Sequence, residues 1–207
     1  GSTLFDLSPN ANHGWYLGTM NLSSPGVLTN DSDTAVNFQN GGAQIPDHAS
    51  LSSATKLSLA FWFKPTAIPV GYADHIISKW GGGGTGTANY VLYYFGTTSG
   101  ADGQLTLLAN AGGVWNGICA SFYPTLNIWT HVAITYDTTT NSSKLYVNGS
   151  LVSSGAASGV LATNNGIVAI NNSQIFNGSL DEMAVFNYTL TAQQVAQIYS
   201  SGSFSKC

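Results

Sequence analysis

Residues 56–65, which read KLSLAFWFKP, decide the fold class of this chain. The odd positions of this stretch are all apolar, and they are Leu57, Leu59, Phe61 and Phe63. Successive side chains of a β-strand point to opposite faces, so this alternation is typical of a strand with one face in a core. Proline has no N–H to donate to a strand ladder, and Pro65 therefore marks the end. The stretch predicts a half-buried β-strand.

Several other short runs share this pattern and are separated by turn residues. They cover residues 90–95, 104–109, 130–136, 144–147, 166–170 and 180–186. The dipeptide Asn148-Gly149 follows one of these runs and favours a two-residue hairpin turn, because both residue types tolerate a positive φ. Many short strands divided by turns are typical of an all-β sandwich or barrel.

Only one segment of the chain has the pattern of a helix. Thr191 and Gln194 form a capping box, in which each side chain can bond to the backbone N–H of the other. Apolar residues then follow on one face of the expected helix, at positions 195, 198 and 199. We expect one short C-terminal helix. No linker or shift in composition divides the sequence, so we expect a single domain over residues 1–207.

The composition excludes several classes of protein. The chain has 207 residues, of which 43% are hydrophobic and 7% charged, and its net charge is −4. A disordered chain would lack the five Trp, ten Tyr and nine Phe. Its five cationic side chains are scattered, which excludes nucleic-acid binding, and no apolar run of about 18 residues predicts membrane insertion. Abundant Ser, Thr, Asn and Gly indicate an extracellular protein or one at a cell or virion surface.

The cysteines and the Asn-x-Ser/Thr triplets bear on the same question of location. Cys119 and Cys207 allow one bridge or two free thiols, and a bridge that holds the C-terminus suits an oxidising compartment. N-glycosylation triplets begin at Asn21, Asn30, Asn141, Asn148, Asn171, Asn177 and Asn187. A chain rich in Asn and Ser also produces such triplets by chance. They predict a glycoprotein only where the source organism glycosylates.

Seven segments occur in a specific order along the chain. They are residues 35–46, 59–65, 76–79, 129–137, 144–149, 176–182 and 186–191. Their order and spacing resemble the laminin-G-like, pentraxin-type domains of the concanavalin A-like lectin/glucanase superfamily. The resemblance extends from Leu4 to Tyr199. It implies a concanavalin A-like jelly roll, in which two antiparallel sheets enclose an apolar core.

The resemblance also implies a structural calcium ion near the crossing of the N-terminal segment. Its ligands would be Asp6, the backbone carbonyls from Asn40 to Gly42, and Asp181. Calcium binds six to eight oxygen atoms of this kind. Two simpler interpretations stay open: Asp6 can be the acid of an Asx-turn before Ser8, and Asp181 can be a charge at a strand end.

Glucanases belong to the same superfamily, but the residues of this chain do not support hydrolysis. A glycosidase needs two carboxyl groups at a set separation. The sequence holds one glutamate, Glu182, and the adjacent Asp181 would point to the opposite face of a strand. A Gly-x-Ser-x-Gly elbow for a serine nucleophile is also absent from the sequence. We therefore expect a protein that is not an enzyme.

Carbohydrate binding is the leading functional hypothesis. Aromatic rings stack on the faces of sugars, and amides bridge pairs of hydroxyls. The candidate residues are Tyr72, Asp74, Trp80, Tyr90, Trp115, Asn116 and Tyr123, with His75 beside them. We expect the rings among them on loops at one end of the sandwich or on its concave side. The opposing interpretation is that a chain with so many aromatics exposes several of them without function.

The sequence thus predicts a non-catalytic, extracellular recognition domain with a glycan or glycoconjugate partner. The alternative is a structural or adhesive subunit of a surface, filament or viral assembly, which would bind other protein subunits through its sheets. Low charge and many small polar residues suit such lateral packing. Jelly rolls host both kinds of function, so the fold alone does not decide between them.

Overall fold

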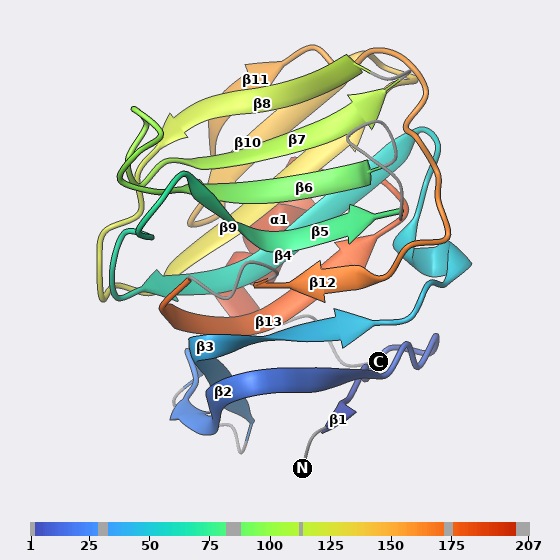
Figure 1. Cartoon of the computed structure of the whole chain (residues 1–207). Coiled ribbons are helices and arrows are strands. Elements are labelled where there is room, and N and C mark those ends of the chain that lie inside the picture. Colours follow the sequence, from blue (N-terminus) through green and yellow to red (C-terminus); the bar gives the residue numbers. More distant parts are fainter. Residues whose placement is uncertain (1–2, 29–32, 82–87, 112–113, 172–175, 202–207) are drawn as a thin grey trace.

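The structure is a computed structural model that describes residues 3–28, 33–81, 88–111, 114–171 and 176–201, with the backbone alone for residues 111 and 114–121. The described part is mostly β-structure with one C-terminal helix (Figure 1). In chain order the elements are β1 (Thr3–Leu4), β2 (Gly14–Pro25), β3 (Thr34–Ile45), the 3-10 turn η1 (Ala49–Leu51), β4 (Lys56–Pro65), β5 (Ala73–Trp80), β6 (Ala88–Phe95), β7 (Leu105–Ala111), β8 (Val114–Phe122), β9 (Thr130–Asp137), β10 (Ser142–Val147), β11 (Ser150–Gly155), β12 (Val168–Ile170), β13 (Gly178–Phe186) and α1 (Ala192–Ser201).

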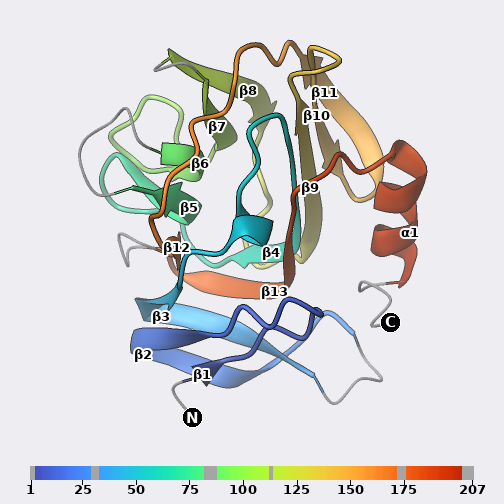
Figure 2. The same ribbon diagram turned by 90° about the vertical axis from the view of Figure 1, so that its right-hand side faces the viewer.

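The strands form two layers that face each other. We call β12-β5-β6-β7-β8 the front sheet and β11-β10-β9-β4-β13 the back sheet, in the order in which neighbours are hydrogen-bonded. Figure 2 shows the two layers from the side, with the segment from β11 to β12 passing across the strand ends of the front sheet. All pairings are antiparallel. The predicted antiparallel jelly roll is confirmed.

Strand β3 joins the two sheets. Its first half pairs with β13, where Val36 lies opposite Leu180, and its second half pairs with β12, where Ile45 lies opposite Val168. The hairpin of β2 and β1 adds to the other edge of β3. The two layers are therefore the halves of one curled sheet that encloses a continuous core.

Inward-facing side chains of both sheets fill this core. The alternating residues Leu57, Leu59, Phe61 and Phe63 of β4 are all at most 1% exposed, as their spacing predicts. Phe63 stacks on Phe176 with ring centroids 5.3 Å apart. Tyr94 of the front sheet meets the edge of the Phe63 ring, also at 5.3 Å. The two sheets are thus joined by close aromatic packing at their centre.

The helix α1 covers the outer face of the back sheet (Figure 2). Thr191 and Gln194 form the expected capping box, because the Gln194 N–H donates to the Thr191 hydroxyl and the Thr191 N–H donates to the Gln194 side chain. Val195 is fully buried and packs with Ala60 and Ala133 of the sheet. The predicted short C-terminal helix is confirmed.

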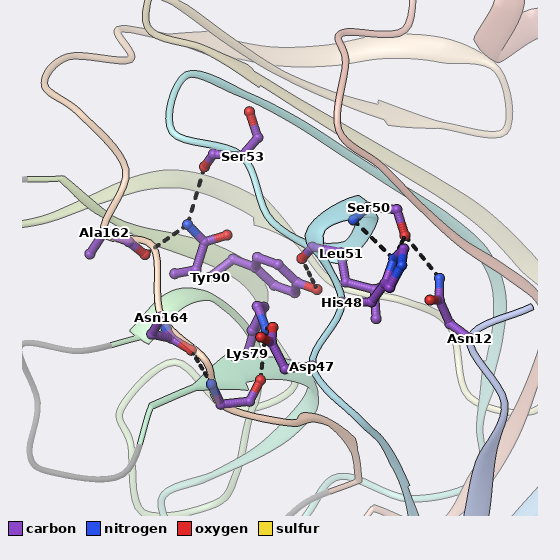
Figure 3. Close-up of polar contacts among 12 residues, drawn as sticks. Asn12, Asp47, His48, Ser50, Leu51, Ser53, Lys79, Tyr90, Ala162 and Asn164 are labelled. Carbon is purple, nitrogen blue, oxygen red and sulfur yellow. Dashed lines mark hydrogen bonds and ion pairs between the residues drawn. The ribbon is translucent and has the colours of Figure 1, made fainter. Parts of the chain in front are cut away.

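Polar contacts hold the loops at one end of the front sheet (Figure 3). The buried Lys79 ammonium donates to Asp47 and to the carbonyl of Gly166. The Asn89 amide donates to the carbonyls of Ser53 and Ala162. These contacts join the β3–β4 connection and the β11–β12 connection to strands β5 and β6.

Of two predictions about local structure, one is confirmed and the other is corrected. Asn148 and Gly149 both have positive φ, at 48° and 77°, and they join β10 to β11 as the predicted hairpin. The stretch around Trp115, whose ring we expected on a loop or on the concave side of the sandwich, is strand β8 and not a loop. Pairing with β7 overrides the weak strand propensity of the glycines there. Among the residues that the structure describes, no helix is both long and apolar enough to cross a bilayer.

Candidate functional site

The outer face of the front sheet carries a group of aromatic side chains on strands β5 and β6. Strand alternation buries Leu92 and Tyr94 in the core and turns Tyr93 and Phe95 outwards. On β5, His75 lies directly opposite Tyr93, so its ring is on the same outer face. A β-bulge after His75 shifts the alternation of β5, so that the next paired residue, opposite Leu92, faces the core.

Five rings follow one another across this face, and we call them the aromatic row. They are Trp80, His75, Tyr93, Phe95 and Tyr72, and neighbouring centroids lie 5.8, 4.7, 5.7 and 5.7 Å apart in that order. The Trp80 and His75 rings are almost parallel, at 4°. The Tyr93 and Phe95 rings are also stacked, at 14°. The arrangement is a connected series of ring contacts.

Most of the row is accessible to solvent only in part. Tyr72, which precedes β5, is 64% exposed, and the other four rings are half-buried. The chain therefore leaves parts of several large rings accessible at its surface. Contiguous apolar surface of this kind is typical of binding sites.

Three buried polar atoms on the same face make no hydrogen bond. They are Nδ1 of His75, Oγ of Ser78 and Oγ1 of Thr106, the last lying opposite Tyr93 on β7. Most buried polar atoms in folded proteins have a partner. All three lie on or beside the strands that carry the row.

Burial shifts the pKa values of His75 and Tyr93 in the directions that favour their uncharged forms. Burial lowers the pKa of His75 below its usual 6.5, although the negative charge of Asp74 opposes this shift. Burial and the neighbouring Tyr72 raise the pKa of the Tyr93 phenol above 10. The row therefore offers neutral rings and hydroxyl groups, which suit stacking and hydrogen bonding and not proton transfer.

The structure brings some of the predicted ligand-binding residues into the row. Tyr72 and Trp80 belong to it, although Trp80 is the last residue of strand β5 and not part of a loop. Tyr123 is 54% exposed and follows strand β8. The side chains of Trp115 and Asn116 lie outside the described part, and their backbone pairs with Asn110 and Ala109.

Two of the predicted binding residues do not face solvent. Tyr90 is 0% exposed and lies in the hydrophobic core, so the expectation that its ring is available to a ligand was wrong. Asp74 is also 0% exposed, and its carboxylate accepts hydrogen bonds from the amides of His75 and Phe176. Asp74 therefore holds the backbone at His75 in place and does not itself face a ligand.

Tyr93 and Phe95 are the members of the row that sequence reasoning missed. Residues 88–95 are apolar at nearly every position, so period-two alternation does not reveal which residues face out. The available signal was the excess of rings itself. A strand with aromatics on both faces has more rings than one core side can bury.

The residues predicted to bind calcium do not converge on one point. Both carboxylate oxygens of Asp6 accept hydrogen bonds within its own loop, from Ser8 and Asn12, as in the Asx-turn interpretation. The loop adjoins the end of β3 at Gln44, whereas Asp181 lies beside Val36, eight residues away along β3. At a strand rise of about 3.4 Å per residue this is roughly 27 Å.

The surroundings of each predicted calcium ligand agree with this. Asn40 is exposed on β3 opposite Thr19, and Gly42 is buried opposite Leu17. The Asp181 carboxylate accepts hydrogen bonds from the amides of Val27 and Glu182. Within the described ranges no three His, Cys, Asp or Glu side chains gather closely enough to hold a metal ion. The four residues named do not fit a single calcium site.

The fold and the sequence together decide the family. The sequence model of the laminin G family of the concanavalin A-like lectin/glucanases superfamily matches residues 37–196, well over half of the chain. The chain belongs to this superfamily. The resemblance identified from the seven ordered segments is confirmed. No curated protein sequence matches the chain.

Several solved structures share the concanavalin A-like fold. The binding domain of Paraclostridial Mosquitocidal Protein 1 aligns with a TM-score of 0.72 at 16% identity, over 96% of this chain and 49% of that chain. Domain 4 of AbnA, an extracellular arabinanase from Geobacillus stearothermophilus in complex with arabinotriose, aligns with 0.68 at 21% identity, over 90% and 87%.

A third similar structure is the ligand binding domain of botulinum neurotoxin serotype D in complex with N-acetylneuraminic acid. It aligns with a TM-score of 0.69 at 13% identity, over 96% of this chain and 50% of that chain. The chain therefore spans about half the length of the toxin domains and nearly all of the arabinanase domain. Structurally, this concanavalin A-like domain resembles carbohydrate-binding domains of toxins and of an arabinanase.

Proposed function

We propose that this protein is a non-catalytic glycan-binding domain and that the aromatic row on the front sheet is its binding platform. The observation that carries the proposal is the row itself: five connected rings of which one is largely exposed and four are half-buried. The C–H groups of a pyranose or furanose ring pack against aromatic faces. A connected series of rings suits a ligand with several sugar units.

The polar groups of this face support the same proposal. A sugar presents hydroxyls around its rim, and binding sites place a few polar groups beside the apolar surface to orient it. The hydroxyls of Tyr72 and Tyr93 and the imidazole of His75 are such groups. The similar arabinanase domain was solved with arabinotriose, and the similar serotype D domain with N-acetylneuraminic acid.

The absence of catalysis is part of the proposal. Glu182 is the one glutamate of the sequence and lies on β13 of the back sheet, away from the row. General acid–base cleavage of a glycoside requires two carboxyl groups around the scissile bond. The similar toxin structures are named as binding domains. An extracellular location is consistent with glycan binding and with the composition.

The test is to remove single rings and measure glycan binding. A glycan array first identifies a ligand. Tyr72→Ala and Tyr93→Ala should then each weaken the binding of that ligand about tenfold, which corresponds to about 1.4 kcal/mol. Isothermal titration calorimetry measures the affinities. Tyr188→Ala is the matched control, because Tyr188 is 46% exposed and lies between β13 and α1, beside the back sheet. Equal affinity of all three variants and the wild type would refute the platform.

A second candidate function is contact with another protein subunit, and one surface favours it. Phe5, Leu7, Trp15 and Leu17 of the N-terminal segment and β2 are between 37% and 71% exposed. Analytical ultracentrifugation of the wild type and of Trp15→Ser tests whether this surface joins two copies of the chain. A monomer at all concentrations counts against self-assembly.

A structural calcium ion remains a prediction from the family resemblance, but one ion cannot take ligands from both Asp6 and Asp181, which lie at opposite ends of β3. An ion that binds only the folded state raises its stability, by about 2.7 kcal/mol at a hundredfold excess over Kd. EDTA is then expected to lower the melting temperature, and Asp181→Asn to remove the difference. Asp6→Asn changes the predicted ligand at the other end of β3. Comparing it with Asp181→Asn shows which end of β3 holds the ion. An unchanged melting curve in EDTA contradicts the prediction.

A further inference from the structure

The described lysines all lie away from the aromatic row. Lys56 and Lys64 alternate with the buried odd positions of β4, so they are on the outer face of the back sheet, and Lys144 of β10 is there for the same reason. Lys56 pairs with Asp137 at 3.7 Å, and Lys64 lies 4.7 Å from the centroid of the Trp129 ring.

Lys79 is the described lysine on the front sheet, and it faces the interior. It lies opposite Tyr90 on the core side of β5 and is 0% exposed. Its ammonium donates to Asp47 at 2.5 Å and to the Gly166 carbonyl at 2.7 Å (Figure 3). Its charge is thereby compensated inside the protein. It does not reach the row.

A negative charge lies close to the row. The Asp74 carboxylate is fully buried directly behind His75, and its oxygens accept the amides of His75 at 2.7 Å and Phe176 at 2.6 Å. Its field reaches the His75 ring, whose pKa it raises against the larger lowering by burial. His75 still stays neutral near pH 7, so the five rings of the row carry no positive charge of their own.

From this distribution of charge, and resting on the proposed function, we propose that the aromatic row selects neutral glycans and discriminates against glycans that carry a carboxylate. A uronic acid or sialic acid that stacks on the rings would lose water around its carboxylate without gaining an ion pair. Burial of an unpaired charge is costly. The nearby Asp74 carboxylate adds repulsion, which is strong at short range in a poorly hydrated site.

The experiment compares matched sugars that differ in the carboxylate. Galactotriose is compared with trigalacturonate, lactose with sialyllactose, and a mixed array of neutral and acidic oligosaccharides covers other sugar types. The wild-type protein is expected to bind neutral members, and to bind the acidic analogue of any neutral ligand at least tenfold more weakly. Acidic glycans bound as well as or better than their neutral analogues would overturn the selectivity and leave the glycan platform standing.

A lysine placed beside the row tests the charge argument directly. Thr98 is exposed, and its N–H donates to the carbonyl of Gly71, next to Tyr72. Thr98→Lys is expected to improve binding of the acidic analogue by about tenfold at low salt, and salt should reverse the gain. Thr19→Lys on β2 adds the same charge far from the row and should change nothing.

The outcomes separate the two proposals. If Thr98→Lys leaves the preference for neutral glycans unchanged, the shortage of positive charge is not its cause and the inference fails. If Tyr72→Ala, Tyr93→Ala and the wild type all bind no member of the array, the proposed function fails, and the selectivity fails with it.

Discussion

The two sheets each carry a tryptophan next to a histidine on the outer face, and the two pairs differ in how deeply they are buried. On the back sheet Trp62 and His131 lie 5.3 Å apart and are 8% and 1% exposed, because Tyr199 of α1 packs against both rings. On the front sheet Trp80 and His75 lie 5.8 Å apart and both stay half-buried.

This difference shows what the helix does for the fold. Rings on the outer face of a sheet need cover, and on the back sheet the chain supplies it with its own last element (Figure 2). On the front sheet the aromatic row extends from Trp80 to Tyr72 and remains partly exposed. We therefore expect substitutions of the pair on the back sheet to change stability and substitutions of the pair on the front sheet to change ligand binding. Each prediction below tests that division.

The largest effect is expected from loss of the covered tryptophan. Trp62→Ala should lower the free energy of unfolding by about 3–5 kcal/mol, because it leaves a cavity between β4 and α1. Trp80→Ala, at a half-buried position, should cost about 1–2 kcal/mol. Urea denaturation of the two variants measures both. Equal losses would show that the two faces do not differ in the way that the burial implies.

The second prediction concerns the pH dependence of stability. Burial lowers the pKa of His131 from 6.5 to about 4, and neither ring nitrogen has a hydrogen-bond partner. Between these two pH values the unfolded chain binds a proton that the folded chain does not, so stability is complete above about pH 6.5 and decreases as the pH falls towards 4. The expected loss is about 3 kcal/mol.

His131→Phe isolates this contribution. Phenylalanine keeps a ring between Trp62 and Tyr199 but does not titrate, and it removes two unpaired buried nitrogens. The variant should be as stable as the wild type or more so at pH 7, and its stability should depend much less on pH between 6.5 and 4. A slope equal to that of the wild type would assign the pH dependence to other groups.

Sequence reasoning succeeded where local chemistry decides the structure. The alternation of residues 57–63, the Asn148-Gly149 turn and the capping box of Thr191 each specify their element without help from distant residues. The ordered segments then identified the family. These features were sufficient to predict the jelly roll and its helix.

Sequence reasoning failed where long-range pairing decides which side of a strand is buried. Residues 88–95 are apolar on both faces, so Tyr90 was expected at the surface, whereas register with β5 and β7 places Tyr90 in the core and Tyr93 outside. A bulge after His75 changes which residues of β5 face out. Such a bulge leaves no clear mark in one sequence. The fold was therefore predictable, whereas two of the five rings of the candidate site were not.

The third prediction tests the half-buried Trp80 as a binding residue. Trp80→Ala should weaken the glycan identified on the array by about tenfold, whereas Trp80→Phe, which keeps an aromatic face next to His75, should lose less than threefold. Calorimetric titration at 25 °C, where Trp80→Ala remains folded, separates binding from stability. An affinity of Trp80→Ala equal to that of the wild type would limit the binding platform to the other end of the row, at Phe95 and Tyr72.

The smallest effect is expected when the cover of the back pair is removed. Tyr199 is 38% exposed, so Tyr199→Ala should cost only about 1 kcal/mol of stability. Its loss opens the groove of about 360 Å³ that Trp62 and Tyr199 line together, and water then reaches the histidine behind it. The pKa of His131 should rise from about 4 towards 6.5, because burial is the cause of its depression.

Titration of the His131 ring by NMR measures this shift, and the His75 ring in the same spectra is the internal control, since nothing near it changes. A His131 pKa that stays near 4 would mean that β4 and β9 alone enclose the ring, and that the back sheet differs from the front sheet even without its helix.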